Sequence, residues 1–323
     1  MIDRRALIGA TLASLCAAAT GINGQPTRKL PVVGFLTSFG VASLARLREG
    51  LVELGYVEGK TIVLEQRTAR GRPEALPALA SELVRLNVDV LYATGPPAIR
   101  AAKNATSVIP IIALDLETDP VESGLAQSLA RPGGNVTGLF LNFPDMAGKW
   151  LELLREAAPG RHRVGLLWDS TTGSTQVTAA TAAAHRLDID LQVLRVRNSD
   201  EINEALERGV RAGTTAIVAL SSPIVIGSSK SIAEFTTRNR LPAISPFREF
   251  ADSGGLLSYG PKLRDFYLRA AFFVDKILHG AKAADLPIEQ PTTFELVINQ
   301  KTAKVLGLTI PKTLLLRADE VIQ

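Results

Sequence analysis

The sequence predicts an α/β protein made of two doubly wound, parallel-sheet lobes. Three observations lead to this expectation. From Leu30 onward, short apolar runs alternate with amphipathic helical stretches. The apolar runs carry hydrophobic residues on both faces, as do parallel strands that are covered on both sides by helices. The chain also has 323 residues, enough for two domains of ordinary size, and the strand–helix cycle runs twice without a low-complexity linker.

The first series of elements begins with a buried strand at 32–36 and a helix at 41–54. Leu44, Leu47 and Leu51 share one face of that helix, and Gly55 follows where a left-handed cap is favoured. Strands are then predicted at 61–65, 89–93, 110–114 and 136–140, with helices at 73–86, near 97–105 and near 121–129.

A second series follows, with the same alternation. Its predicted helices are 145–157, 179–187, 200–211 and 229–239, and its strands are 164–168, 191–196, 216–220, 243–245 and 256–258. The tail then breaks the cycle with a helix at 263–278, an extended connector at 287–291, a strand at 294–298 and a short helix at 301–306.

We expect the tail to cross back to the first lobe and then return to the second, which gives a multi-crossover hinge. The predicted first lobe comprises residues 28–141 plus 261–288, and the second comprises 142–260 plus 289–323. A hinge of this kind lets two lobes move without separating.

The first 25 residues are predicted to be a signal peptide that is cleaved on export. Arg4 and Arg5 precede an apolar run at 6–19, which ends in the Ala-x-Ala pattern of Ala17–Ala19. The run is shorter than the ~20 residues needed to span a membrane, and a buried first helix would carry a polar face. We therefore expect a soluble periplasmic protein. Export by the general or the twin-arginine route, and lipidation of Cys16, both stay open.

Several classes of function are disfavoured. The formal net charge is only +4 and no basic stripe is present, so we expect no nucleic-acid partner. The three histidines are far apart, which predicts no metal site. The dinucleotide, phosphate-loop and nucleophile-elbow motifs are absent, so we expect no cofactor and no catalytic residues.

Short polar residues follow most of the predicted strands. In open parallel sheets the ligand lies outside the carboxyl ends of the strands, so these residues are the candidate ligand-binding set. The set comprises Thr37, Ser38, Thr94, Gly95, Asp115, Asn142, Asp169, Ser221, Ser222, Phe247 and Tyr259. For each single residue, capping of the following helix or turn is the competing interpretation.

The residue types suggest how a ligand would be held. Hydroxyls and backbone N–H groups of the first lobe would bind a carboxylate. Asp169 would bind an amino group if the ligand is an amino acid, and Phe247 or Tyr259 would cover the ligand's side chain.

Several sequence blocks resemble a known family. They are 55–60 (GYVEGK), 76–80 (LPALA), 131–138 (RPGGNVTG), 246–250 (PFREF), 254–260 (GGLLSYG), 290–299 (QPTTFELVIN) and 317–322 (RADEVI). In combination they are similar to the substrate-binding proteins of the ABC transporter family that includes tryptophan and tyrosine binders. The resemblance covers nearly all of the predicted mature chain. It implies a type I periplasmic binding fold, in which two lobes close over a small-molecule ligand.

The same resemblance implies that a permease and an ATPase at the inner membrane are partners of a monomeric binding protein. Three alternative functions compete with this one. A ligand-sensing receptor for a signalling partner would look the same in sequence. A periplasmic enzyme would need a catalytic pair that the sequence does not offer. A transcriptional regulator would need a DNA-binding module before Leu30, where the apolar leader lies.

Overall fold

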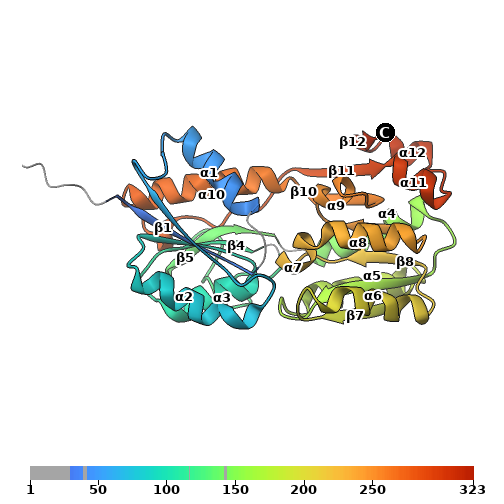
Figure 1. Cartoon of the computed structure of the whole chain (residues 1–323), viewed down its shortest axis with the longest axis horizontal. Coiled ribbons are helices and arrows are strands. Elements are labelled where there is room, and N and C mark those ends of the chain that lie inside the picture. The colour runs from blue at the N-terminus through green and yellow to red at the C-terminus, as the bar shows by residue number, and fades with distance from the viewer. Residues whose placement is uncertain (1–29, 39–41, 116, 142–143) are drawn as a thin grey trace, which may run out of the picture.

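The first lobe is built on a five-stranded sheet (Figure 1). The computed structural model describes residues 30–38, 42–115, 117–141 and 144–323. All neighbouring strands of this sheet pair in parallel, in the order β2-β1-β3-β4-β5. The strands are β1 (Val32–Thr37), β2 (Val63–Thr68), β3 (Val90–Thr94), β4 (Ile111–Asp115) and β5 (Val136–Phe140).

Helices cover both faces of this sheet, because its strands are apolar on both sides. The helical segments are α1 (Ala42–Glu53), the 3-10 turn η1 (Pro73–Ala75), α2 (Leu76–Arg85), α3 (Pro96–Ala105), α10 (Leu263–Leu278) and the 3-10 turn η2 (Ala283–Asp285). Phe35 and Tyr92 point to the buried cluster that includes α1 and α10, whereas Leu36 and Leu91 belong to the cluster of α2 and α3. Alternate residues of one strand thus enter different cores.

The second lobe is built on a seven-stranded sheet of order β12-β11-β10-β9-β8-β6-β7. Its strands are β6 (Arg163–Asp169), β7 (Asp190–Val196), β8 (Ala216–Ala219), β9 (Ala243–Ser245), β10 (Leu257–Pro261), β11 (Phe294–Asn299) and β12 (Glu320–Ile322). Strand β11 runs antiparallel to β10, and the other neighbouring pairs are parallel. The five strands β7-β6-β8-β9-β10 repeat the order of the first sheet, with β11 and β12 added at one edge.

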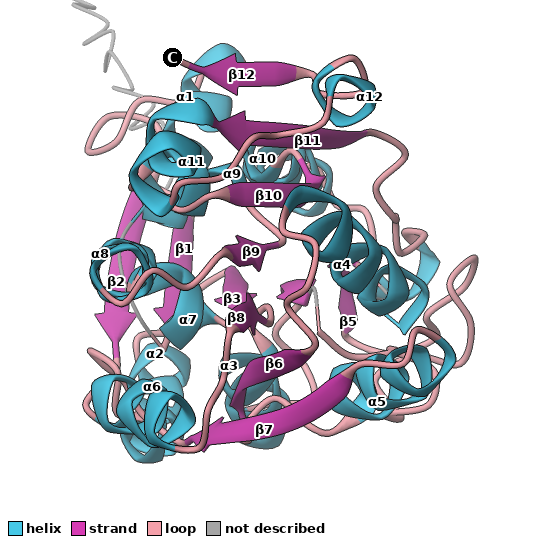
Figure 2. Ribbon diagram, turned by 90° about the vertical axis from the view of Figure 1, so that its right-hand side faces the viewer, coloured by secondary structure: helices cyan, strands magenta, loops and turns pink. Residues whose placement is uncertain are grey.

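Helices α4 and α5 lie on one face of this sheet and α6, α7 and α8 on the other, as Figure 2 shows. The helices of this lobe are α4 (Pro144–Ala157), α5 (Thr175–Arg186), α6 (Glu201–Arg211), α7 (Pro223–Gly227), α8 (Ser229–Arg238), α9 (Arg248–Asp252), α11 (Gln300–Leu306) and α12 (Lys312–Leu315). Across the described residues, no helix is long and apolar enough to cross a membrane.

The chain passes between the two sheets three times: from β5 to α4, from β10 to α10, and from Glu289 to β11. Helix α10 packs along α1 and against β4 and β5, so it belongs to the first lobe although it follows a strand of the second. Glu289 is bridged to Leu139 and binds Arg269 of α10, with 2.6 Å between Nη2 and Oε1. The expected α/β class and the multi-crossover connection of two lobes are confirmed; the proposed boundaries between them stay a prediction.

One expected element is wrong: residues 121–129 form turns, not a helix. Asp119 Oδ1 accepts hydrogen bonds from the amides of Val121 and Glu122, and Gly124 follows with φ +70°. The amides of Leu125 and Ala126 then both donate to the Pro120 carbonyl. The Asp side chain and the left-handed glycine thus close a turn where apolar spacing alone suggested a helix.

The second strand is shifted, because the predicted range 61–65 begins within a turn and β2 covers Val63–Thr68. The Thr61 amide donates to the Val57 carbonyl, which delays the start of the strand. The short elements α7, α9, α12 and β12 were not anticipated by the periodicity of the sequence. The predicted signal peptide, with Arg4, Arg5 and Cys16, lies outside the described residues and stays a prediction.

Candidate functional site

Each sheet has a topological switch point beside its first strand, because the next two strands of the chain lie on opposite sides of that strand. In the first sheet it lies between β1 and β3, and in the second between β6 and β8. The carboxyl ends of strands at such a point leave a crevice in which ligands bind. Three contacts described below join the two switch points, so the crevices of the two lobes face each other.

The first lobe contributes hydroxyl groups at its switch point. Thr37 ends β1 and Thr94 ends β3, and the Thr94 hydroxyl donates to Thr37 Oγ1 over 2.8 Å. Both side chains are buried, as is Ser38, which is 1% exposed. Ser38 Oγ has no hydrogen-bond partner among the residues that the structure describes. A buried hydroxyl without a partner is costly, so its position suits a group that accepts from it or donates to it.

Gly95 brings the two lobes into contact. It precedes α3 with φ +82° and ψ 153°, a conformation that residues with a Cβ rarely adopt. A Cβ at this position would lie 2.3 Å from Cγ of Pro223, the first residue of α7 in the second lobe. While Pro223 is present, only glycine therefore allows the start of α3 to approach its ring this closely.

Asp115, at the end of β4, is fully buried and organises the turn that follows it. Its Oδ1 accepts hydrogen bonds from the amides of Glu117 and Thr118, each over 3.0 Å. Burial raises the pKa of this carboxyl, and the hydrogen bonds from Thr118 and Glu117 act in the opposite direction. These local bonds show that Asp115 caps a turn, and direct contact of its side chain with a ligand stays a prediction.

Glu117 is a site residue that the sequence reasoning missed. Its side chain comes from the first lobe and is 4% exposed, and its Oε1 accepts a hydrogen bond from the Ser221 hydroxyl of the second lobe over 2.6 Å. The predicted set comprises residues at or next to a strand end, whereas Glu117 lies two residues after the end of β4. The available signal was Asp115 itself, since an Asp at a strand end often closes a turn that presents the next side chains.

Asp169 ends β6 and supplies a second buried carboxylate, which is 1% exposed. Its Oδ1 accepts from the amide and the hydroxyl of Thr171, over 2.9 and 2.7 Å. Its Oδ2 has no partner of good geometry within the described residues. Burial raises the pKa of Asp169 above its ordinary value of 3.8; the bonds to Thr171, the nearby Ser222 hydroxyl and the charge of Arg100 act against this rise.

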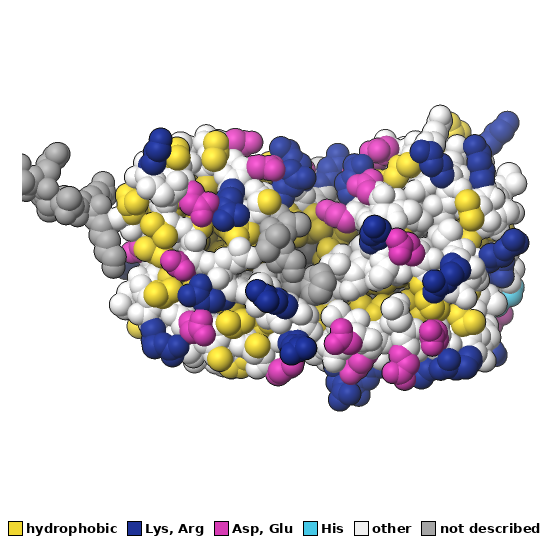
Figure 3. All heavy atoms as spheres, viewed as in Figure 1, with side chains coloured by type: hydrophobic (Ala, Val, Ile, Leu, Met, Phe, Trp, Pro, Cys, Tyr) yellow, Lys and Arg dark blue, Asp and Glu magenta, His cyan; other side chains and the backbone are white. Residues whose placement is uncertain are grey.

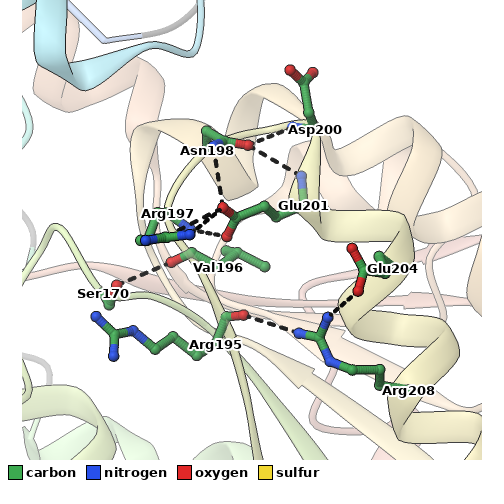
Figure 4. Close-up of polar contacts among 9 residues, drawn as sticks. All are labelled: Ser170, Arg195, Val196, Arg197, Asn198, Asp200, Glu201, Glu204 and Arg208. Atoms are coloured by element: carbon green, nitrogen blue, oxygen red, sulfur yellow. Dashed lines mark hydrogen bonds and ion pairs between the residues drawn. The ribbon is translucent and has the colours of Figure 1, made fainter.

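The loop after Asp169 is held in place by hydrogen bonds to the neighbouring strand β7. Figure 4 shows the Ser170 hydroxyl directed at the carbonyl of Val196, the last residue of β7, to which it donates over 3.2 Å. The Ser170 amide binds the same carbonyl. Arg100 of α3 reaches over from the first lobe and donates to the Thr171 carbonyl. The loop therefore holds Asp169 in place and also forms a contact between the lobes.

Ser221 and Ser222 follow β8 and are both buried. The side-chain amide of Gln176 brackets the Ser221 peptide group, donating to its carbonyl over 3.1 Å and accepting from its amide over 3.2 Å. This leaves the Ser221 hydroxyl directed at Glu117. The Ser222 hydroxyl accepts from the Val225 amide over 3.1 Å, so it caps α7, as the competing interpretation had it.

The two aromatic candidates lie in the packing of the second lobe. Phe247 is 2% exposed and belongs to the large buried cluster. The Tyr259 ring stacks on Phe294 of β11 at 6.3 Å between centroids, and its carbonyl accepts from Trp150 Nε1 over 2.8 Å. A role of either ring as cover for a ligand stays a prediction. Asn142 lies outside the described residues.

Two tyrosines extend the polar region around Glu117. The pKa of Tyr92 in β3 and that of Tyr267 in α10 are both raised chiefly by burial, and Tyr267 raises the pKa of Tyr92 further. The carboxylates of Glu249 and Glu117 raise the pKa of Tyr267 further. A cavity of about 450 Å³ is lined by Tyr267, by Arg46 of α1 and by Glu249 of α9.

The chemistry of the site is that of recognition by hydrogen bonds and charge. Within the described ranges, no group of three or more His, Cys, Asp or Glu side chains is placed to hold a metal ion. On the face shown in Figure 3, Lys and Arg are interspersed with Asp and Glu and do not form a continuous basic stripe. Buried carboxylates and hydroxyls of both lobes lie at facing strand ends, a donor and acceptor set that suits the capture of a small polar molecule.

Comparison with known proteins agrees with this geometry. A solved structure from Vibrio cholerae, described as a conserved domain protein, is 26% identical, with a TM-score of 0.83, over 91% of this chain and 100% of that one. An ABC domain from Streptococcus pneumoniae in complex with L-Trp is also 26% identical, with a TM-score of 0.81 over the same shares. A tyrosine-binding protein from Clostridioides difficile (strain R20291) is 25% identical over 316 residues, which is 94% of this chain and 90% of the relative.

The model of one protein family, described as ABC transporter substrate binding protein, matches residues 41–322. That match includes every strand of both sheets except β1, and it includes the candidate site residues from Thr94 onward. The chain therefore belongs to the ABC transporter substrate-binding protein family.

Proposed function

We propose that this chain is the periplasmic component of an ABC importer and that it binds a small organic ligand, an amino acid or an aromatic or carboxylate compound, in the cleft between its lobes. The observation that carries this proposal is the pairing of two buried switch points. Ser38 and Asp169 each present a buried oxygen that lacks a partner among the described residues, one from each lobe. A ligand bound between the lobes would satisfy both.

The choice of ligand class is supported by the relatives. One similar protein is named for binding tyrosine and another was solved with L-Trp, and both match more than nine-tenths of this chain. Identities of 25% and 26% leave room for a different side chain on the ligand. The proposal is therefore kept to a class of compounds, with a permease and an ATPase as partners of a monomer.

Ligand capture would work through closure of the lobes. Three contacts, Glu117 with Ser221, Arg100 with Thr171 and Gly95 against Pro223, link the lobes in this structure. A ligand that touches both walls binds the closed form better than the open one and so shifts the population toward it. The closed form is then the species that the permease would distinguish from the open one.

A thermal-shift and calorimetry screen of the processed protein tests this function. We expect at least one amino acid or aromatic carboxylate to raise the melting temperature, because a ligand at 100 times its Kd stabilises the folded state by ~2.7 kcal/mol. Sugars and nucleosides serve as the control compounds. If only these controls shift the melting temperature, the proposed ligand class is wrong.

A further inference from the structure

We propose that Arg100 is a positioning residue of the closed form. Its bond across the cleft slows the release of a bound ligand that Arg100 itself does not contact. The inference rests on the proposed function and concerns the kinetics of that function, so it holds for any ligand class that the cleft accepts.

The bond begins on a helix that is packed firmly in the first lobe. Arg100 belongs to α3, and its guanidinium Nη2 donates to the Thr171 carbonyl of the second lobe over 2.5 Å. On either side of Arg100, Ile99 and Ala101 are buried in the core of the first lobe, whereas the Arg100 side chain is exposed. The helix therefore presents the guanidinium to the second lobe from a packed support.

The acceptor carbonyl lies in a loop that is itself hydrogen-bonded within the second lobe. The Thr172 hydroxyl donates to the Asp169 carbonyl over 2.8 Å, and the Gly173 carbonyl accepts from Trp168 Nε1 over 2.8 Å. Because these bonds fix the loop on both sides of Thr171, a bond to its carbonyl costs little further conformational entropy.

Charge favours the same contact. The pKa of Asp169 is raised chiefly by burial, and the positive charge of Arg100 is among the effects that lower it. The guanidinium therefore attracts the ionised carboxylate as well as donating to the nearby carbonyl. A charged donor forms a stronger hydrogen bond than a neutral one, although the exposure of Arg100 to solvent reduces the gain.

A second contact at the start of the same helix fixes the angle between the lobes. Gly95, which precedes α3, lies close against Pro223 of α7. Arg100 follows further along α3, after a rise of about 7.5 Å. Two contacts at separate points of one packed helix resist rotation of the lobes as well as their separation.

The Arg100 contact also lies away from one of the crossings of the chain between the lobes. Helix α3 covers the face of the first sheet opposite to α10, which directly follows the crossing from β10 (Figure 1). Rotation about that crossing moves α3 away from the loop after β6, so the bond breaks as the cleft opens. The bond therefore stabilises the closed form and not the open one.

Loss of the Arg100 bond should act on ligand dissociation. A bound ligand leaves from the open form, so a lower ratio of closed to open protein raises the dissociation rate constant by the same factor. Entry also takes place in the open form, which we expect to dominate without ligand. The association rate constant should therefore change little.

Stopped-flow fluorescence with the ligand found in the screen measures both rate constants. Arg100→Gln removes the charge and is too short to reach the Thr171 carbonyl. It should raise the dissociation rate constant about 5- to 10-fold and change the association rate constant less than about 2-fold. The order of affinities across the ligand panel should stay that of the wild type, because Arg100 does not contact the ligand. Arg100→Lys keeps a charged donor and should release the ligand at an intermediate rate.

Arg155→Gln is the matched control. Arg155 is an exposed arginine of α4 whose guanidinium donates to the Leu187 carbonyl over 3.2 Å, but both residues belong to the second lobe. This variant loses the same kind of bond without any loss of contact across the cleft. Its rate of ligand release should match that of the wild type.

A second measurement needs no ligand. In the double variant Gly95→Cys, Pro223→Cys, a disulfide forms only while the lobes are closed, so its rate of formation follows the closed fraction. Addition of Arg100→Gln should slow disulfide formation about 5- to 10-fold relative to the double variant alone. Addition of Arg155→Gln should leave that rate unchanged.

The two measurements separate the inference from the proposed function. If Arg100→Gln releases the ligand at the wild-type rate, changes the order of affinities in the panel, or leaves disulfide formation unchanged, the inference is overturned while solute binding stands. If no compound of the panel binds to folded protein, the proposed ligand class fails, and the rate of disulfide formation alone decides whether Arg100 holds the lobes together.

Discussion

Asp169 shows at the scale of one residue how the burial of a charged group opposes the stability of the fold. Its carboxyl is 1% exposed, one oxygen is bonded to Thr171, and the other lacks a partner among the described residues. Burial raises its pKa above 3.8, so the folded state holds the proton more tightly than the unfolded state does. Ionisation of this group therefore destabilises the fold.

We expect Asp169→Asn to stabilise the ligand-free protein at pH 7 by roughly 1–2 kcal/mol, because it removes a buried charge and keeps an oxygen for Thr171. The same change should weaken ligand binding. The sign of the pH effect follows from the raised pKa: wild-type stability falls as the pH rises from 3.8 to the folded-state pKa, so the advantage of the variant should vanish below pH 3.8.

Urea denaturation at a series of pH values measures this difference. Asp190→Asn, which removes an exposed partner of Arg163, is the control and should change stability little. A variant at Asp169 that is less stable than the wild type at pH 7 would show that the carboxylate is compensated in the ligand-free protein.

Residues such as Thr37, Thr94, Asp169 and Ser221 could be placed at the ends of strands from sequence, because the apolar runs that precede them mark the strands. Glu117 could not be placed in this way. Its position depends on the turn that Asp115 closes, and its partner Ser221 lies 104 residues away in the chain. Apolar periodicity carries no information about such long-range polar pairs.

At the scale of elements, the packing of α1 on α10 ties the second chain segment of the first lobe to its beginning. Gly50, inside α1, lets the two helices approach: a Cβ there would lie 2.8 Å from Cβ of Ala271 and 3.1 Å from the carbonyl oxygen of Leu268. Glycine is a poor residue in the interior of a helix. Its presence at this position is explained by the close contact with α10.

Gly50→Ala sets two effects against each other. Alanine improves helix propensity by ~1 kcal/mol, whereas a clash in a packed interface costs ~1–3 kcal/mol. Because one of the neighbours is backbone, which cannot move aside cheaply, we expect a net loss of stability of about 1–2 kcal/mol. Urea denaturation checks this. Glu53→Ala, at the exposed end of α1, is the control and should change stability by less than ~0.5 kcal/mol; a stabilised Gly50→Ala would contradict the interpretation.

Long elements with a clear apolar period could be predicted well: the helix Leu263–Leu278 and the strand Val136–Phe140 have the expected ends. Elements whose formation depends on side-chain hydrogen bonds or on pairing with distant segments could not be predicted. Asp119 and Gly124 close turns in a segment whose apolar spacing resembled a helix. Strand β12 has three residues and is defined by pairing with β11, which no local pattern reveals.

At the scale of the whole molecule, the structure has the two lobes in contact across the cleft. The approach of Gly95 to Pro223 offers a direct way to test closure, because an ideal Cβ on Gly95 lies 3.7 Å from Cβ of Pro223. This distance lies within the ~3.5–4.5 Å range of disulfide-bonded cysteines. The only cysteine of the sequence is Cys16, which lies in the predicted leader.

We expect the double variant Gly95→Cys, Pro223→Cys to form a disulfide under oxidising conditions in the processed protein. The oxidised protein should hold the lobes together, so that free ligand no longer enters and bound ligand no longer leaves; addition of a reductant should restore exchange. The reduced form of the same variant is the control for backbone strain at Gly95. Stopped-flow fluorescence with the ligand found in the screen provides the measurement. Unchanged exchange in the oxidised protein would refute closure as the capture step.

The repeated strand order has one more consequence. Because β7-β6-β8-β9-β10 copies β2-β1-β3-β4-β5, Thr37 and Asp169 occupy equivalent places, at the ends of β1 and β6. A binding protein with two identical lobes, related by a two-fold axis, would bind its ligand equally well in two opposite orientations. Here the equivalent places hold an uncharged hydroxyl on one side and an acid on the other. We therefore expect this difference at matching positions to give a bound ligand one preferred orientation, with a defined end facing each lobe.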